Sequence, residues 1–247
     1  MLRRTKKPFY GLVALASSTI ATVSIFVLAI LVFVFYSLVL GILISLIALY
    51  SLATYLIPIY YINPLKSIDL SHMLTLEGSE LVLDVGCGLG RATNGAAKLL
   101  TTGKVIGVDI WDKLEIPGNS PEKAYRNSEI EGVRDRVEFR YGDAFQLPFD
   151  DELFDVVICA GLLTSFRGDQ EKVISIREMR RVLKTNGTLL MREPINKLRT
   201  ILVLSPSIYL IHMPSKKHWM ELLQHSDFKN IEYFPHRIAG SFKTIKS

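Results

Sequence analysis

A run of glycines between a short apolar stretch and a helical stretch is the part of the sequence best suited to chemistry. Leu81–Val85 predicts a strand, and Gly86, Gly88 and Gly90 follow it at alternate positions before Arg91 opens the helix. Glycines reach positive φ angles and let a ligand approach the backbone closely. The helix N-terminus then faces the polar end of that ligand. The run predicts a ligand-binding turn rather than a merely tight turn.

The spacing of the glycines distinguishes between nucleotide cofactors. The dinucleotide fingerprint is G-x-G-x-x-G. Here the turn is G-x-G-x-G, with Arg91 where the third dinucleotide glycine would stand and Asp84 ahead of the turn inside the strand. A nicotinamide-dependent oxidoreductase is therefore disfavoured.

Two more acidic residues follow predicted strands. Asp109 lies near the end of the strand Val105–Ile110, where a carboxylate can accept both hydrogen bonds of a ribose diol. Asp143 follows the strand Val137–Tyr141 and stands between Gly142 and Ala144. Asp109 is therefore a candidate for contacts with a ribose, whereas an Asp after a Gly is also common in ordinary turns.

Taken together, these motifs resemble class I S-adenosylmethionine-dependent methyltransferases, whose first motif is D-x-G-x-G-x-G. Leu147-Pro148-Phe149, Phe154-Asp155-Val156-Val157 and the run from Glu178 to Lys184 follow in order. This series looks like methyltransferase type 11, the subgroup that includes the ubiquinone and menaquinone C-methyltransferases. The resemblance covers about residues 78–194 and implies S-adenosyl-L-methionine as the cofactor.

The resemblance also implies roles for single residues. Asp84 would bond the glycine turn or the amino group of the cofactor, Asp109 the ribose, and Asp143 the adenine amine. Ile110 or Trp111 would pack on the adenine. The expected cofactor-binding residues are Asp84, Gly86, Cys87, Gly88, Gly90, Asp109, Ile110, Trp111, Asp143, Ala144 and Cys159.

The two cysteines and the five histidines add little chemistry of their own. Cys87 has no neighbouring His or Lys in the sequence to activate it, so a small filler of the turn is preferred to a nucleophile. Cys159 ends a predicted strand and either lines the pocket or belongs to the core. The histidines lack metal-ligand spacing, so no metal is expected.

The acceptor is expected to enter over residues 160–166, after the fourth predicted strand. Many relatives carry a His there, whereas this chain has none, and the catalytic residue is therefore unknown. The candidates for the acceptor pocket are Ala160, Gly161, Thr164 and Ser165. An Asn-Pro-Pro-Tyr type of motif is absent, which argues against methylation of a nucleic-acid base amine.

Strands and helices alternate between residues 66 and 247, which predicts an α/β fold with a doubly wound, mostly parallel sheet; the resemblance implies seven strands and a Rossmann-like methyltransferase fold. Helices are expected at 91–100, Pro121–Glu131, 170–183 and 218–225. The last strands are expected at 188–192, 230–234 and Ala239–Ile245. An apolar segment, 201–211, is interpreted as a cap over the acceptor or as an interfacial element.

No charged residue or histidine occurs from Pro8 to Leu65. One helix of that length would far exceed a bilayer core of about 30 Å, so two transmembrane helices are expected near residues 10–34 and 39–60. The positively charged residues between positions 3 and 7 predict a multi-pass membrane protein whose catalytic domain is cytoplasmic. The expected division is a hairpin domain, 1–65, and a methyltransferase domain, 66–247. A single span with an interfacial helix is the alternative.

Composition excludes several classes of protein. Apolar residues make up 49% of the 247 residues, charged residues 21%, and only two are cysteines. These values exclude a disordered chain and a disulfide scaffold. The net charge of +5 gathers at the chain ends rather than in a phosphate track, so no nucleic-acid partner is expected.

The leading hypothesis is a membrane-anchored methyltransferase of a small, hydrophobic or lipid-like acceptor, with a lipid bilayer as partner. The alternatives are a methyltransferase of a protein or a soluble metabolite, and a non-catalytic cofactor-binding scaffold. The oligomeric state, the pathway and the atom that receives the methyl group do not follow from the sequence.

Overall fold

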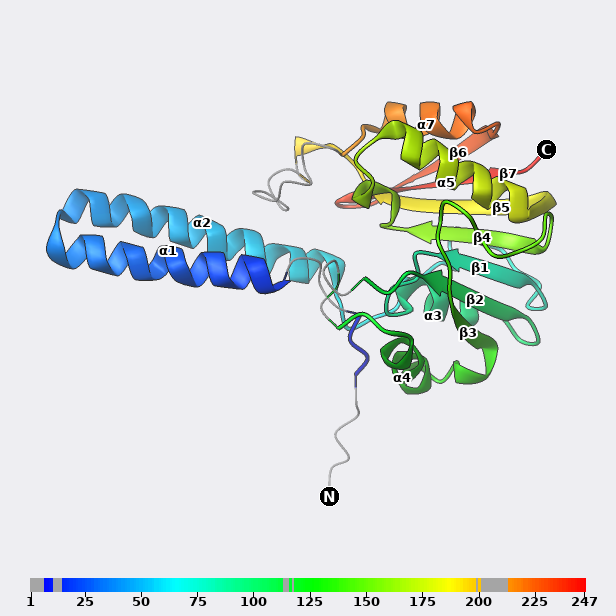
Figure 1. Cartoon of the computed structure of the whole chain (residues 1–247), viewed down its shortest axis with the longest axis horizontal. Coiled ribbons are helices and arrows are strands. Elements are labelled where there is room, and N and C mark those ends of the chain that lie inside the picture. Colours follow the sequence, from blue (N-terminus) through cyan, green and yellow to red (C-terminus); the bar gives the residue numbers. More distant parts are fainter. Residues whose placement is uncertain (1–6, 11–14, 113–115, 117, 199, 201–212) are drawn as a thin grey trace, which may run out of the picture.

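A seven-stranded sheet with helices on both faces forms the body of the molecule, and a long helical hairpin projects from it (Figure 1). The computed structural model describes residues 7–10, 15–112, 116, 118–198, 200 and 213–247. The sheet order is β3-β2-β1-β4-β5-β7-β6. The strands are β1 Leu81–Val85, β2 Lys104–Asp109, β3 Val137–Tyr141, β4 Phe154–Ala160, β5 Leu183–Pro194, β6 Lys229–Pro235 and β7 Ala239–Ile245.

The sheet is mixed. The pairs β1–β2, β1–β4, β2–β3 and β4–β5 are parallel, whereas β7 runs antiparallel to both β5 and β6. The prediction of an α/β fold with seven mostly parallel strands is confirmed, with the last two strands forming an antiparallel edge. Because the strands from β3 to β5 are parallel, their carboxyl ends share one edge of the sheet, and this edge faces the base of the hairpin (Figure 1).

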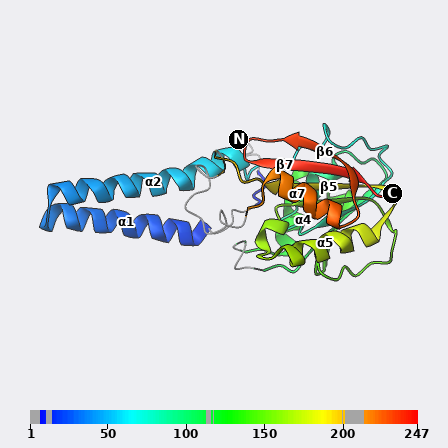
Figure 2. The ribbon, with the colours of Figure 1, turned by 90° about the horizontal axis from the view of Figure 1, so that it is seen from above.

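The central strands are buried on both faces, as a doubly wound sheet requires. On one face, α5 (Asp169–Val182) and α7 (Lys216–His225) cover a core that includes Trp219 and Phe242. On the other face, α3 (Arg91–Ala97) and α4 (Pro121–Glu131) cover a second core that includes Phe139. Figure 2 shows α5 and α7 in a view turned by 90°. The short helices η1 (Arg134–Arg136) and η2 (Leu163–Ser165) follow α4 and β4.

Local sequence signals explain the bounds of α4. The hydroxyl of Ser120 accepts from the backbone N–H of Lys123, and Pro121 occupies the first turn, where its missing N–H costs nothing. Gly132 ends the helix with φ +72°, a left-handed angle that favours glycine.

The fifth strand differs most from its prediction. Residues 188–192 were expected, whereas β5 begins at Leu183 and continues to Pro194. Pairing explains the extension, because β5 bonds β4 on one side and β7 on the other. The apolar segment 201–211 lies outside the described residues.

The uncharged N-terminal stretch forms two antiparallel helices, α1 (Leu15–Phe35) and α2 (Leu38–Ile62) (Figure 1). Large apolar side chains on both are exposed, with Phe35 at 73% and Tyr36, in the turn, at 86%.

Within the described residues, neither helix reaches the length and hydropathy that a membrane crossing requires. This finding contradicts the two predicted spans and, with them, the multi-pass membrane localisation. The division at residue 65 stays a prediction.

Candidate cofactor site and acceptor wall

The glycine turn lies at the carboxyl edge of the sheet, between β1 and α3. Gly86, Gly88 and Gly90 all have positive φ, at +71°, +50° and +82°. The N–H groups of Gly86 and Cys87 donate to the carbonyl oxygen of Val108 on β2, which fixes the turn against the neighbouring strand. The sequence prediction of a strand, a glycine turn and a helix is confirmed.

Asp84 lies on β1 just beneath this turn and is 1% exposed. Its Oδ2 accepts from the hydroxyl of Thr93 on α3 at 2.6 Å, and its Oδ1 has no partner. Burial raises the pKa of Asp84 to about 7. An unpartnered buried carboxylate oxygen is costly unless a donor or a cation meets it, so it fits the cationic amino group of S-adenosylmethionine.

Asp109 ends β2 and is bonded from three sides. Its Oδ2 accepts from the N–H of Gly88 at 2.8 Å, and its Oδ1 accepts from the N–H of Trp111 at 2.7 Å and from Nδ2 of Asn119 at 3.2 Å. The carboxylate therefore joins the glycine turn to the segment that follows β2. A carboxylate offers about four acceptor positions, so this arrangement leaves capacity for a ribose hydroxyl.

Asn119 was not predicted from the sequence. It is 3% exposed, and its Oδ1 has no partner although its Nδ2 donates to Asp109. The sequence feature that could have indicated Asn119 is its place as a polar residue just ahead of the Ser120-Pro121 helix start. That position also fits an ordinary turn. Asp109 and Asn119 together present oxygen acceptors at the end of β2.

The remaining predicted cofactor residues fall at the same edge. Ile110 is exposed, and the ring of Trp111 meets Phe139 edge-on at 6.3 Å. Asp143 is exposed and accepts from the N–H of Phe145 at 2.9 Å, while Ala144 is buried. Asp143 thus has a structural role in its turn, in addition to the predicted contact with adenine.

The two cysteines are buried on either side of Asp84. Burial raises the pKa of both thiols, and the neighbouring carboxylates raise it further. Cys159 also lies 3.8 Å from Oε1 of Glu193. Neither thiol is prepared for nucleophilic chemistry. No group of residues that could hold a metal ion occurs in the described part of the chain.

The predicted acceptor residues form the turn after β4. Ala160 ends the strand, Gly161 is exposed with φ +81°, and η2 contains Thr164 and Ser165. Leu162 in this turn lies against Gly86, because a Cβ built on Gly86 would come within 2.9 Å of Leu162 side-chain atoms. The turn is therefore the wall beside the glycine turn.

Glu193 on β5 holds this wall and was not predicted. It is fully buried. It accepts from the N–H of Leu163 at 2.9 Å, the N–H of Thr164 at 3.4 Å and the hydroxyl of Thr164 at 3.1 Å. Burial raises the pKa of Glu193 to about 7 against the effect of these bonds. Its signal was an acid in the apolar run of the fifth strand, which sequence alone does not connect with a turn 30 residues earlier.

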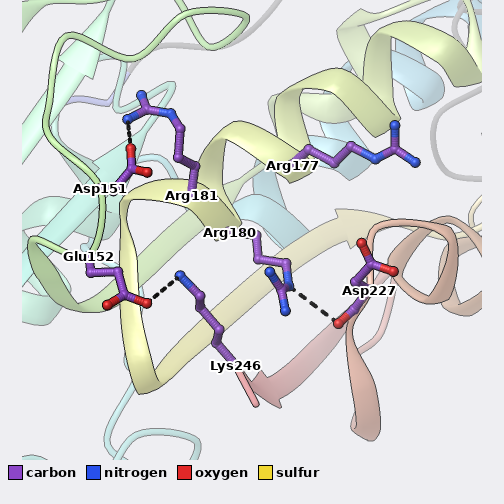
Figure 3. A pocket seen from close by; sticks show the side chains of 7 residues that line it. All are labelled: Asp151, Glu152, Arg177, Arg180, Arg181, Asp227 and Lys246. Carbon is purple, nitrogen blue, oxygen red and sulfur yellow. Dashed lines mark hydrogen bonds and ion pairs between the residues drawn. The ribbon is translucent and has the colours of Figure 1, made fainter.

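A separate polar cavity of about 520 Å³ is lined by residues of α5, of the loop before β4, of the loop after α7 and of the C-terminal end of the chain (Figure 3). Its side chains are largely bonded to one another: Arg181 to Asp151, Lys246 to Glu152, and Arg180 to the carbonyl oxygen of Asp227. These residues belong to the amino ends of the strands, remote from the glycine turn. The cavity is not part of the cofactor site.

Comparisons with known proteins agree with this geometry. A family model described as "Methyltransferase domain" matches residues 76–227. An uncharacterised protein of Haemophilus influenzae is 34% identical over 158 residues, which cover 62% of this chain and 60% of that protein. The demethylmenaquinone methyltransferase of Staphylococcus aureus is 34% identical over 113 residues, covering 45% of this chain and 42% of the enzyme. The matches thus span 60% or less of these relatives.

Among solved structures, a methyltransferase from Aquifex aeolicus that depends on S-adenosylmethionine superposes with a TM-score of 0.59 at 17% identity. The match covers 72% of this chain and 87% of that one. This likeness supports the fold, and the family model supports the reaction. The chain therefore belongs to the family that this model describes as a methyltransferase domain.

Proposed function

We propose that this methyltransferase transfers its methyl group to a small, apolar acceptor that enters over residues 160–166. The apolar wall beside the glycine turn carries the proposal. Leu162 packs against Gly86, and the rings of Phe145 and Phe166 lie 4.7 Å apart near the same turn. Ligand pockets for apolar molecules are lined by such side chains.

The relatives support the same class of acceptor. The S. aureus enzyme is named for demethylmenaquinone, and a relative from Amycolatopsis mediterranei, 35% identical over 122 residues, is named for 27-O-demethylrifamycin SV. These names describe those proteins. Both named acceptors are small molecules rather than proteins or nucleic acids.

For the cofactor, we propose that Asp84 Oδ1 accepts from the amino group, that Asp109 and Asn119 bind the ribose, and that Trp111 and Ile110 flank the adenine. The free oxygen of Asp143 would accept from the adenine amine. The glycine turn and Cys87, Ala144 and Cys159 complete the surrounding surface.

The bound cofactor supplies an activated methyl group on a sulfonium, so the chain contributes alignment and exclusion of water. The buried Asp84 orients one end of the cofactor, and the Leu162 turn shields the reacting region from solvent. Glu193 fixes that turn. No strong base is required when the acceptor is already anionic or soft.

The proposal is tested with the full-length protein, methyl-labelled S-adenosylmethionine and three fractions of a cell extract: organic-soluble compounds, aqueous metabolites and proteins. We expect label in the organic-soluble fraction, and we expect Asp109→Ala to reduce it at least about tenfold, since bonds to charged groups contribute about 1.5–3 kcal/mol. Binding of S-adenosylhomocysteine is measured alongside. Label confined to the aqueous or protein fraction would contradict the apolar acceptor and would favour a soluble metabolite or a protein as the acceptor instead.

A further inference from the structure

A group of basic side chains gathers at the carboxyl edge of the sheet. We call Arg91, Arg192, Lys197 and His236 the basic cluster. Arg91 opens α3, Arg192 lies near the end of β5, Lys197 follows that strand, and His236 lies between β6 and β7. Four separate segments therefore contribute to one region.

The pairing of β5 with β7 brings Arg192 and His236 together. Arg192 pairs with Ser241 across the antiparallel ladder, and the hydroxyl of Ser241 lies 2.9 Å from Nε2 of His236. The ring of His236 in turn meets the ring of His72 edge-on at 6.0 Å. These contacts hold the imidazole on the Arg192 side of the sheet.

Lys197 follows β5 at the same edge, but its contacts lie on the α7 face of the sheet, because Tyr233 packs against Phe242 in the core under α7. Its Nζ donates to the hydroxyl of Tyr233 on β6 at 3.2 Å, and Nζ of Lys216 lies 4.3 Å from the centre of that ring. The segment 195–217 contains four lysines and arginines and one histidine, and it contains no Asp or Glu.

Burial and the neighbouring positive charges act on the cluster in the same direction. Burial, together with repulsion from Arg192, His72 and Lys197, lowers the pKa of His236 to about 4. Burial and Arg192 likewise lower the pKa of Arg91 to about 10. In the described part of the chain, Arg192, Lys197 and His236 form no ion pair with a carboxylate.

Half-buried cations without counter-charges cost free energy, and a bound anion would offset that cost. A guanidinium matches the two oxygens of a carboxylate or phosphate. The basic cluster also borders the acceptor wall, because the N–H of Gly161 donates to the carbonyl oxygen of Arg192 and Ala160 pairs with it.

We propose that Arg192 and His236, with Lys197 on the adjoining α7 face of the same edge, form a binding site for an oxyanion carried by the methyl acceptor. This inference rests on the proposed function for the source of the anion. It adds that the apolar acceptor carries a carboxylate or a phosphate group, which the basic cluster holds while the apolar part lies on the Leu162 wall.

The test uses the full-length protein and two simple probes, inorganic phosphate and benzoate. The ring signals of His236 are titrated by NMR with each probe present and absent, after assignment with His236→Gln. A bound oxyanion is expected to raise the pKa of His236 by about one unit, because an opposite charge favours the protonated ring. A response to phosphate alone assigns a phosphate group, and a response to benzoate alone assigns a carboxylate.

Arg192→Gln is expected to weaken probe binding at least about tenfold, since it removes the charged donor. Arg180→Gln is the matched control, because this arginine bonds backbone carbonyl oxygens in the remote cavity of Figure 3. Binding that survives Arg192→Gln but is lost in Arg180→Gln would overturn the proposal, as would an unchanged His236 titration with both probes.

Binding of S-adenosylhomocysteine in the same samples separates the two proposals. If the wild type binds it and methylates an apolar acceptor but the probes leave His236 unchanged, only the oxyanion site fails. If the probes bind and no label reaches organic-soluble compounds, the oxyanion site is supported and the proposal of an apolar acceptor is refuted. A variant that has lost its fold is recognised by loss of S-adenosylhomocysteine binding and is replaced by Lys197→Gln.

Discussion

At the scale of single residues, two buried carboxylates, Asp84 and Glu193, have pKa values raised to about 7. A raised folded-state pKa means that the folded chain holds the proton more tightly than the unfolded chain does. The stability from this source is complete below about pH 4 and is lost as the pH rises through about 7. In the ligand-free chain, the negative charge of Asp84 is therefore uncompensated above about pH 7.

Asp84→Asn tests this reasoning. The amide keeps an acceptor for Thr93 and removes the buried charge, so the ligand-free variant should be about 1–3 kcal/mol more stable than the wild type at pH 8. It should also bind S-adenosylmethionine more weakly. Denaturant unfolding between pH 5 and pH 8 measures the first effect and calorimetry the second.

Asp150→Asn, at an exposed position, is the control and should change neither quantity. A wild-type and an Asp84→Asn protein with the same stability at pH 8 would contradict the assignment of an uncompensated charge to Asp84.

The sequence was informative about residues whose role follows from local position. Asp84, Asp109 and the glycines stand beside strand ends, where pattern alone indicates a ligand. Asn119 and Glu193 act through partners that only the folded chain supplies, Asp109 for one and the Thr164 turn for the other. The roles of these two residues could not be predicted from the sequence, because contacts between distant segments create them.

At the scale of elements, the short helix α3 follows the glycine turn that we propose as part of the cofactor site. Its six residues Ala92–Ala97 are buried, and Gly95 faces the carbonyl oxygen of Ile68 so closely that a Cβ would lie 2.1 Å from it. The segment before β1 therefore fixes the helix from outside. Periodicity predicted the helix well but extended it to residue 100, because the apolar residues after Ala97 fit the same pattern.

Gly95→Ala should therefore destabilise the protein by about 1–3 kcal/mol through overpacking, although alanine favours helices by about 1 kcal/mol over glycine. Chemical denaturation measures the change. Gly132→Ala is the comparison, because its Cβ meets nothing within 4 Å and only its left-handed φ is strained. A more stable Gly95→Ala would mean that the Ile68 segment yields to the added carbon.

At the scale of the whole molecule, the N-terminal segment is joined to the catalytic body by specific polar contacts. The hydroxyl of Tyr10 donates to Glu131 on α4 at 2.8 Å and accepts from Asn94 on α3 at 3.0 Å. The N–H of Phe9 donates to Asn127 on α4. The absence of charge over residues 8–65 predicted a separate unit, whereas these bonds depend on single polar groups that a hydropathy pattern does not register.

The two tryptophans lie in contrasting places in this architecture. Trp111 is half-buried beside Asp109, and Trp219 is fully buried under the sheet, where its indole N–H donates to the carbonyl oxygen of Pro194. The chain therefore contains its own optical probe and an internal reference. With excitation selective for tryptophan, S-adenosylhomocysteine should change the red-shifted part of the fluorescence emission and leave the blue part constant. Trp111→Phe should abolish this response while binding persists by calorimetry, and a response that survives the substitution would place the ligand elsewhere.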